Sequence, residues 1–225
     1  MNGFSTNAIH GGSLRDQYGS HVLPVYRTAA FDWESTDAAA RTMASFLDGS
    51  NAGESYVYSR VSNPTVTDFE HRVASLYGAG GAVAFASGMG AIAGLLFSVL
   101  KAGDHVVYGE SLYSATTHLI GSRLPPFGIE TTAVDTMSLD AVQRAIRPNT
   151  RLIYCETPAN PTMGLTDLSG IARLAAEANA LSVVDNTFAT AFNTQPLELG
   201  IDVVVESATK YIEQQTAALA VLHGA

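Results

Sequence analysis

Residues 201–210, Ile201-Asp202-Val203-Val204-Val205-Glu206-Ser207-Ala208-Thr209-Lys210, carry the strongest indication of both fold and chemistry in this chain. Residues 201–205 predict a short, mainly apolar strand of the kind that is buried on both faces of a parallel sheet. The polar run Ser207–Lys210 follows this strand directly. Lys210 is one of only two lysines in the chain, so its position indicates a chemical role beside the alternative of an ordinary exposed lysine.

Similar strands recur along the preceding sequence, with helices between most of them. The predicted strands cover residues 82–86, 105–108, 129–134, 151–156, 181–185 and 201–205. The predicted helices cover residues 89–100, 113–122, 139–146 and 168–180. This alternation predicts an α/β fold, a mostly parallel sheet flanked by helices, in which ligands bind beyond the carboxyl ends of the strands.

The first 60 residues differ from the rest of the chain. They are rich in Gly, Ser, Asn, Thr and aromatic residues, and they predict an extended N-terminal arm with one short helix over residues 37–47. A helix then begins cleanly, because Asn63 suits the N-cap, Pro64 the first helical position and Gly78 the C-terminal cap. We therefore expect an arm with a short helix over residues 1–60 and an α/β domain over residues 61–225.

Composition excludes several classes of function. The net charge of −9 argues against a nucleic-acid partner and against an anionic membrane surface, and no apolar run is long enough to span a bilayer. Cys155 is the only cysteine, so neither an internal disulfide nor a cysteine-based zinc site is possible, and the six histidines show no metal-ligand spacing. The N-terminus shows no signal peptide, and we expect a cytoplasmic protein without a metal.

A turn of small residues, Ser87-Gly88-Met89-Gly90, lies between a predicted strand and a predicted helix. Free backbone N–H groups at a helix N-terminus favour a phosphate, although glycine can also serve only to relieve strain in a tight turn. Gly88-Met89-Gly90-Ala91-Ile92-Ala93 also matches the dinucleotide fingerprint Gly-x-Gly-x-x-Ala, with Glu110 as the acid that would bind the ribose. An NAD(P)-dependent oxidoreductase is therefore a second hypothesis, but it leaves Lys210 unexplained.

Two other predicted strands are followed by polar residues. Asp185-Asn186-Thr187 comes at the end of the strand over residues 181–185, where a carboxylate can hold a pyridinium nitrogen protonated. The same Asp-Asn pair also suits a simple turn. The segment Thr157-Pro158-Ala159-Asn160-Pro161 follows the strand over residues 151–156, and its two prolines would hold Asn160 at the same edge of the sheet.

An aromatic residue and an arginine complete the set of candidates. Tyr113, at the start of a predicted helix, can stack on an aromatic ring, and Arg60 in Tyr58-Ser59-Arg60 offers a planar fork to a phosphate. Each residue alone has an ordinary structural explanation. Together with Lys210 and Asp185 they match what pyridoxal phosphate requires of a protein, because a lysine amine forms an imine with its aldehyde and an acid polarises its ring.

The same residues lie in motifs that resemble the Cys/Met-metabolism family of pyridoxal-phosphate enzymes, the trans-sulfuration enzymes. This family includes cystathionine synthases and lyases, methionine gamma-lyases and O-acylhomoserine sulfhydrylases. The similarity runs from about residue 6 to about residue 212. In chain order the motifs are Thr6-Asn7-Ala8-Ile9-His10-Gly11-Gly12, Tyr58-Ser59-Arg60, Asn63-Pro64-Thr65, Ser87-Gly88-Met89, Leu112-Tyr113, Glu156-Thr157-Pro158-Ala159-Asn160-Pro161, Val184-Asp185-Asn186-Thr187-Phe188 and Ser207-Ala208-Thr209-Lys210-Tyr211.

The resemblance implies a role for each candidate residue. Lys210 would bind the cofactor covalently and then move protons, Asp185 would pair with the ring nitrogen, and Tyr113 would stack on the ring and assist proton transfer. The other implied cofactor contacts are Gly88, Met89, Ser207 and Thr209 at the phosphate, Asn160 and Thr187 beside the cofactor, and Tyr58 and Arg60 at the phosphate of a neighbouring subunit.

The resemblance also implies the fold and the activity. The fold would be the large domain of a fold type I pyridoxal-phosphate enzyme, and the active unit a homodimer or homotetramer in which the arm completes the neighbouring site. The reaction would be γ-elimination or γ-replacement on small amino acids that contain sulfur or are O-acylated homoserines. A third hypothesis is an inactive relative that keeps the fold as an assembly module.

The chain departs from the family pattern in two places. After Lys210 and Tyr211 the family usually has a glycine-histidine step and an aspartate, where this chain has Glu213-Gln214-Gln215-Thr216-Ala217-Ala218. The family also has a further C-terminal domain, absent from this chain, which supplies an arginine for the substrate carboxylate. We therefore expect weak turnover, or none, from these 225 residues alone.

Overall fold

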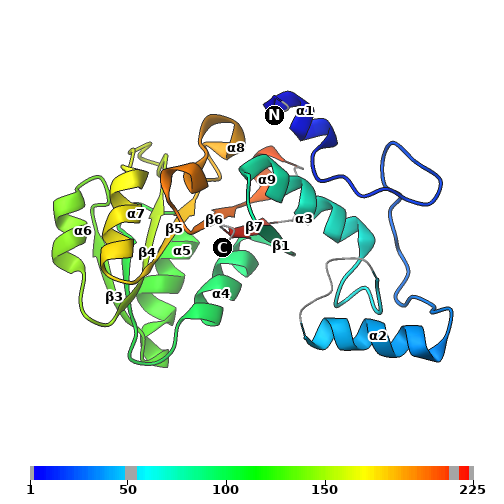
Figure 1. Ribbon diagram of the computed structural model, residues 1–225. Helices are drawn as coiled ribbons and strands as arrows, with labels where there is room; N and C mark the ends of the chain where they lie inside the picture. Colours follow the sequence, from blue (N-terminus) through cyan, green and yellow to red (C-terminus); the bar gives the residue numbers. More distant parts are fainter. Residues whose placement is uncertain (1–2, 49–54, 213–217, 223–225) are drawn as a thin grey trace. The chain divides into compact units, whose positions relative to one another are not determined.

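The computed structural model describes residues 3–48, 55–212 and 218–222, and the chain divides into two compact units, Met1–Ser75 and Leu76–Ala225 (Figure 1). The departure from the family pattern over residues 213–218 lies, except for Ala218, outside the described residues. The first unit contains little regular structure besides helices, and the second unit contains the sheet.

The first unit contains helix α1 (Phe4–His10), helix α2 (Thr36–Leu47) and most of helix α3 (Pro64–Tyr77). The expected helix over residues 37–47 is confirmed as α2, whereas α1 was not predicted. The expected start of α3 is also confirmed, because the Asn63 side chain accepts a hydrogen bond from the Thr65 N–H at 2.9 Å. Gly78 follows α3 with φ +61°, a left-handed conformation that glycine adopts without strain.

The second unit is built on a seven-stranded sheet, in the order β1-β7-β6-β5-β4-β2-β3. The strands are β1 (Gly81–Phe85), β2 (His105–Gly109), β3 (Glu130–Val134), β4 (Thr150–Glu156), β5 (Leu181–Asp185), β6 (Val203–Glu206) and β7 (Ala218–Leu222). The five strands from β6 to β3 pair in parallel, and β7 pairs antiparallel with both β1 and β6. The predicted α/β fold with a mostly parallel sheet is therefore confirmed.

Helices cover both faces of this sheet (Figure 1). The longer ones are α4 (Gly88–Val99), α6 (Leu139–Ala145) and α7 (Leu168–Glu177), and the shorter ones are α5 (Ser114–His118), α8 (Thr190–Asn193) and α9 (Ala208–Tyr211). Two 3-10 turns, η2 (Pro125–Phe127) and η3 (Pro196–Leu199), also belong to this unit. One difference from expectation lies at residues 113–122, where α5 is followed by a π-helical segment, η1 (Leu119–Arg123), rather than by more α-helix.

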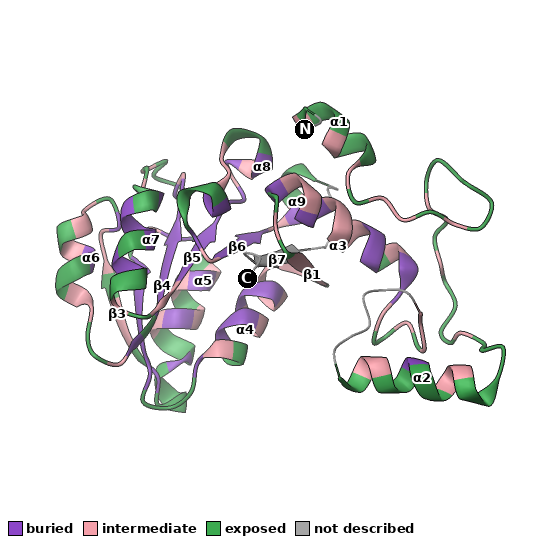
Figure 2. Cartoon of the chain, viewed as in Figure 1, coloured by how far each residue is buried: buried purple, intermediate pink, exposed green. Residues whose placement is uncertain are grey.

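Alternate residues of the central strands pack on opposite faces, as the two-residue period of a strand requires. Tyr154 and Val183 join Leu96 of α4 in one buried cluster. The strands β2, β4, β5 and β6 are buried almost throughout, and they stand out in Figure 2. Burial on both faces is what the continuous apolar runs predicted.

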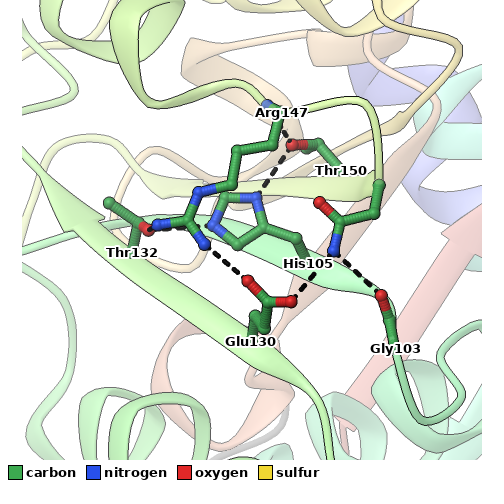
Figure 3. A network of polar contacts seen from close by, with 7 residues as sticks. Gly103, His105, Glu130, Thr132, Arg147 and Thr150 are labelled. Atoms are coloured by element: carbon green, nitrogen blue, oxygen red, sulfur yellow. Dashed lines mark hydrogen bonds and ion pairs between the residues drawn. The ribbon is translucent and has the colours of Figure 1, made fainter.

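The amino edge of the sheet carries a network of polar contacts (Figure 3). His105, with no exposed surface, lies between two hydroxyls: its Nδ1 is 2.8 Å from Thr150 Oγ1 and its Nε2 is 2.8 Å from Thr132 Oγ1. Arg147 donates from Nη2 to Thr132 Oγ1 at 3.1 Å and forms an ion pair with Glu130 at 2.6 Å. These contacts tie β2, β3 and β4 together at the edge opposite to the candidate site.

Candidate active site

A cavity of about 270 Å³ lies at the carboxyl ends of β4, β5 and β6, next to the N-terminus of α4. Its lining residues are Ser87, Gly88, Met89, Ile92, Tyr113, Glu156, Asn160, Asp185, Thr187, Phe188, Val205, Ser207 and Lys210. The structure therefore brings together residues from five separate segments of the chain. This is the edge at which parallel sheets bind ligands.

Asp185 is the last residue of β5 and is only 7% exposed. Its Oδ1 accepts a hydrogen bond from the Thr187 N–H at 3.0 Å, so the turn after β5 fixes the carboxylate. Burial raises the pKa of Asp185, although its hydrogen bonds to Thr187 act in the opposite direction. A buried acid of this kind is stabilised in its charged form by a cationic group that enters the cavity.

The turn between β1 and α4 offers unpaired donors to the cavity. Ser87 is the N-cap of α4, and its side chain accepts a hydrogen bond from the Gly90 N–H at 3.0 Å. The N–H groups of Gly88 and Met89 belong to the first turn of the helix, where no intrahelical acceptor exists. A Cβ at Gly88 would lie 3.2 Å from Ser207 Oγ, so the turn and Ser207 are in close contact. This arrangement suits an anion such as phosphate.

The segments that carry Tyr113 and Asn160 are held by one carboxylate. Glu156, the last residue of β4, accepts the Tyr113 N–H on Oε2 at 2.7 Å and the Asn160 N–H on Oε1 at 2.9 Å. Burial, and then the charge of Asp185, raise the pKa of Glu156 to about 7. The Tyr113 side chain is 46% exposed. Tyr113 also lines the cavity, so part of this residue is open to a ligand there.

Lys210 lies on α9, shortly after β6, and it lines the cavity. The Ser207 N–H donates to Thr187 Oγ1 at 2.9 Å, which ties the start of this segment to the turn after β5. Thr209, which the sequence also predicted as a phosphate ligand, is not among the residues that line the cavity. Its role stays a prediction.

Tyr58 and Arg60 lie in the first unit, in contact with each other. The Arg60 guanidinium carbon is 4.8 Å from the centre of the Tyr58 ring, a cation–π arrangement. The backbone around Tyr58 is paired with Ala30 in an isolated bridge. The two residues thus form one small cluster, and their proposed place at a neighbouring phosphate stays a prediction.

Five residues that line the cavity were not among the site residues predicted from the sequence: Ser87, Ile92, Glu156, Phe188 and Val205. Glu156 could have been found, because it carries the same signal as Asp185, an acid at the end of a buried strand. Ser87 could have been found as the residue before a small-residue helix start. The apolar residues Ile92, Phe188 and Val205 show no local feature that separates them from core residues.

The dinucleotide hypothesis does not fit the topology. Such a fingerprint needs the first strand, its helix and the next parallel strand to lie together as one unit. Here β1 and β2 are separated in the sheet by β7, β6, β5 and β4. Glu110, the expected ribose ligand, instead lines a different cavity together with Asp135 and Met137.

The described residues contain neither a candidate metal cluster nor a helix that could span a membrane. No group of three or more His, Cys, Asp or Glu side chains is placed to hold a metal ion within residues 3–48, 55–212 and 218–222. Within the same ranges, every helix is too short or too polar to cross a membrane.

Comparison with known proteins places the chain among relatives about twice its length. It is 46% identical over 211 residues to an L-methionine gamma-lyase of Fusobacterium nucleatum, which covers 93% of this chain and 52% of that protein. It is 40% identical over 212 residues to an O-succinylhomoserine sulfhydrylase of Pseudomonas aeruginosa, covering 94% of this chain and 51% of the relative. The chain thus spans about half the length of the curated relatives that it matches.

A solved structure agrees with this likeness. A Campylobacter jejuni protein assigned as an O-acetylhomoserine (thiol)-lyase superposes with a TM-score of 0.90 and 33% identity, over 100% of this chain and 55% of that one. That structure contains N'-pyridoxyl-lysine-5'-monophosphate. The model of the family described as Cys/Met metabolism PLP-dependent enzyme matches residues 5–222. With nearly its whole length matched, this chain belongs to the Cys/Met-metabolism family of pyridoxal-phosphate-dependent enzymes.

Proposed function

We propose that this chain is the cofactor-binding part of a pyridoxal-phosphate enzyme that catalyses γ-elimination or γ-replacement on amino acids of the sulfur-containing or O-acylated homoserine type. The observation that carries the proposal is the convergence of Lys210, Asp185 and Tyr113 on one cavity. The substrates named in its relatives, methionine and O-succinylhomoserine, support this class of amino acid.

The residues of the cavity fit this cofactor. When bound, pyridoxal phosphate supplies an aldehyde that condenses with amines and a ring that accepts electron density from the substrate. Asp185 would hold a proton at the ring nitrogen, because its burial makes a cationic partner favourable. The N–H groups of Gly88 and Met89 and the hydroxyls of Ser207 and Thr209 would bind the phosphate.

The remaining side chains would handle protons. The Lys210 amine would take the proton from the substrate α-carbon and return it further along the substrate. The Tyr113 hydroxyl would deliver a proton near the leaving group while its ring lies against the cofactor. Asn160 and Thr187 would limit the orientations that the cofactor can adopt.

We also propose how the rest of the enzyme completes this site. The cofactor-binding domain would extend from residue 61, and the arm over residues 1–60 would bring Tyr58 and Arg60 to the phosphate of a neighbouring subunit in a homodimer or homotetramer. Contacts to the substrate carboxylate would come from sequence beyond these 225 residues. The single, buried Cys155 suits a reducing compartment such as the cytoplasm.

An absorption titration tests this function. Addition of pyridoxal phosphate should produce the visible band of the lysine-bound cofactor in the native chain and in Lys101→Ala, a matched control because Lys101 is the only other lysine. Lys210→Ala should lose the band. A band that survives in Lys210→Ala, or its absence from the native chain, would refute the proposal. Turnover assays with a full-length relative present distinguish an active enzyme from an inactive assembly module.

A further inference from the structure

We infer that Glu156 is the positioning residue of this site: its carboxylate holds Tyr113 and Asn160, which come from different segments, in the arrangement that the cofactor requires. The inference rests on the proposed function for the identity of the ligand. The bridge itself is a feature of the protein alone. It connects residues that lie 43 positions before and 4 positions after Glu156 in the sequence.

The geometry assigns one donor to each carboxylate oxygen. Oε2 accepts from the Tyr113 N–H at 2.7 Å and Oε1 accepts from the Asn160 N–H at 2.9 Å. Glu156 is 5% exposed, so water competes little for these oxygens. Hydrogen bonds to a buried charged acceptor are among the stronger ones in proteins.

The position of Tyr113 depends on its hydrogen bond to Glu156 more than the position of a fully buried residue would. Tyr113 is the N-cap of α5, and its own side chain makes no capping hydrogen bond. Because its side chain is 46% exposed, packing alone does not fix the ring. The hydrogen bond from its backbone N–H to Glu156 therefore sets where α5 begins and where the ring projects into the cavity.

Two N–H donors require two acceptors, and this explains why the residue is a glutamate. A glutamine amide has one acceptor oxygen, and its NH₂ group would face the second N–H donor. Protonation of Glu156 would weaken the bridge in the same way, because one carboxyl oxygen would then carry a hydrogen beside an N–H donor. Asp185 on β5 and Lys210 on α9 are the charged groups that share the described lining of the cavity with Glu156, so the charge of a bound ligand acts on this bridge.

Cofactor affinity in combined variants tests the inference. Glu156→Gln should weaken the binding of pyridoxal phosphate to this chain about tenfold or more. In a background of Tyr113→Ala with Asn160→Ala, the same change should have little further effect, because the groups that Glu156 positions are gone. Glu110→Gln, an exposed acid after β2 that does not line this cavity, should leave affinity unchanged.

Two outcomes of this experiment would contradict the inference. An equal loss in both backgrounds would mean that Glu156 supports the fold without positioning these residues, and no loss in the native background would overturn the inference outright. Circular dichroism on each variant excludes unfolding as the cause of a loss. The conservative rescue is Glu156→Asp, which keeps two acceptors and should retain more affinity than Glu156→Gln.

A readout without cofactor separates this inference from the proposed function. In nuclear magnetic resonance spectra of the cofactor-free chain, the amide protons of Tyr113 and Asn160 should shift together with a pKa of about 7, and Glu156→Gln should abolish both shifts. Independent or absent shifts would contradict the bridge. Failure of the native chain to bind pyridoxal phosphate would refute the proposed function, and the amide titration would still decide whether Glu156 holds the two segments.

Discussion

Glu156 and Asp185 are paired in register at the carboxyl ends of β4 and β5, and both line the same cavity. Residues in register on neighbouring parallel strands project to the same face of a sheet. The two acids therefore share one poorly solvated space, and the charge of Asp185 adds to the burial that raises the pKa of Glu156. The site is prepared for a ligand that carries positive charge near Asp185.

A third acid, Glu206, lies at the end of β6 but on the other face, and it predicts a pH-dependent stability. It is 1% exposed and accepts a hydrogen bond from the Tyr77 hydroxyl, and burial raises its pKa from 4.5 to about 7. A carboxyl group with a raised pKa in the folded state stabilises the fold at low pH, and this contribution disappears as the pH rises from 4.5 through about 7.

Glu206→Gln should therefore flatten the pH dependence of unfolding. As the pH rises across this window, the native chain should lose on the order of 3 kcal/mol of unfolding free energy that the variant does not lose. Urea unfolding of the cofactor-free chain at a series of pH values measures the difference. Glu198→Gln, an exposed acid on η3, is the control. A native chain whose stability does not fall across this window would contradict the assignment.

His105, at the amino edge of the sheet, predicts a pH dependence of stability opposite to that of Glu206. Burial, and then the nearby charge of Arg147, lower its pKa, so the folded chain favours the neutral ring. The contribution of His105 is complete above its unfolded pKa and is lost as the pH falls through the lower folded value. His105→Ala should cost about 2 kcal/mol at about pH 8 and clearly less at about pH 5.5, as measured by urea unfolding. A difference that grows on acidification would show that the ring is charged in the folded state.

Gly88 predicts a specific effect on phosphate binding. A Cβ there would lie 3.2 Å from Ser207 Oγ and 3.3 Å from Ser207 Cβ, so Gly88→Ala must displace the turn or Ser207. We expect about tenfold weaker binding of pyridoxal phosphate, with a smaller effect on pyridoxal, which has no phosphate. Gly81→Ala is the matched control, because a Cβ at Gly81 meets no atom within 4 Å. Equal losses for both ligands would place the phosphate elsewhere.

The proposed exchange of arms between subunits predicts complementation. Arg60→Ala and Lys210→Ala each damage a different half of a shared site. In a mixture of refolded subunits, about a quarter of all sites should contain neither change, because half of the dimers are mixed and each mixed dimer has one intact site. Counting tight cofactor sites by titration measures this fraction. A mixture that behaves as the sum of the two separate variants would show that the arm serves its own subunit or none.

The parallel part of the fold was predicted well, because most of its strands are short, mainly apolar runs with clear ends. The strand over residues 181–185 agrees with β5 at both bounds, and most of the others are shifted by one or two residues. The strand β7 was missed. Its alanines have a weak strand preference, and its place depends on pairing with β1 and β6, which are distant in the sequence.

Most residues of the candidate site were predicted from the sequence, but the hydrogen bonds between its distant segments were not. Eight of the eleven cofactor-binding candidates line the cavity, because polar residues at strand ends converge once the strands are parallel. The bridges at Glu156 and between Tyr77 and Glu206 join residues that no short pattern relates. The π-helical segment after α5 likewise has no signal in local propensity, and it replaces helix that the sequence favours.

The most direct test of the central claim is to locate the cofactor on the chain. After incubation with pyridoxal phosphate and reduction with borohydride, mass spectrometry of peptides should find the pyridoxyl group on Lys210 and leave Lys101 unmodified. Asp185→Asn should lower the extent of labelling, because the anion beside the ring is lost. Labelling of Lys101 or of the N-terminal amine in preference to Lys210 would contradict the account.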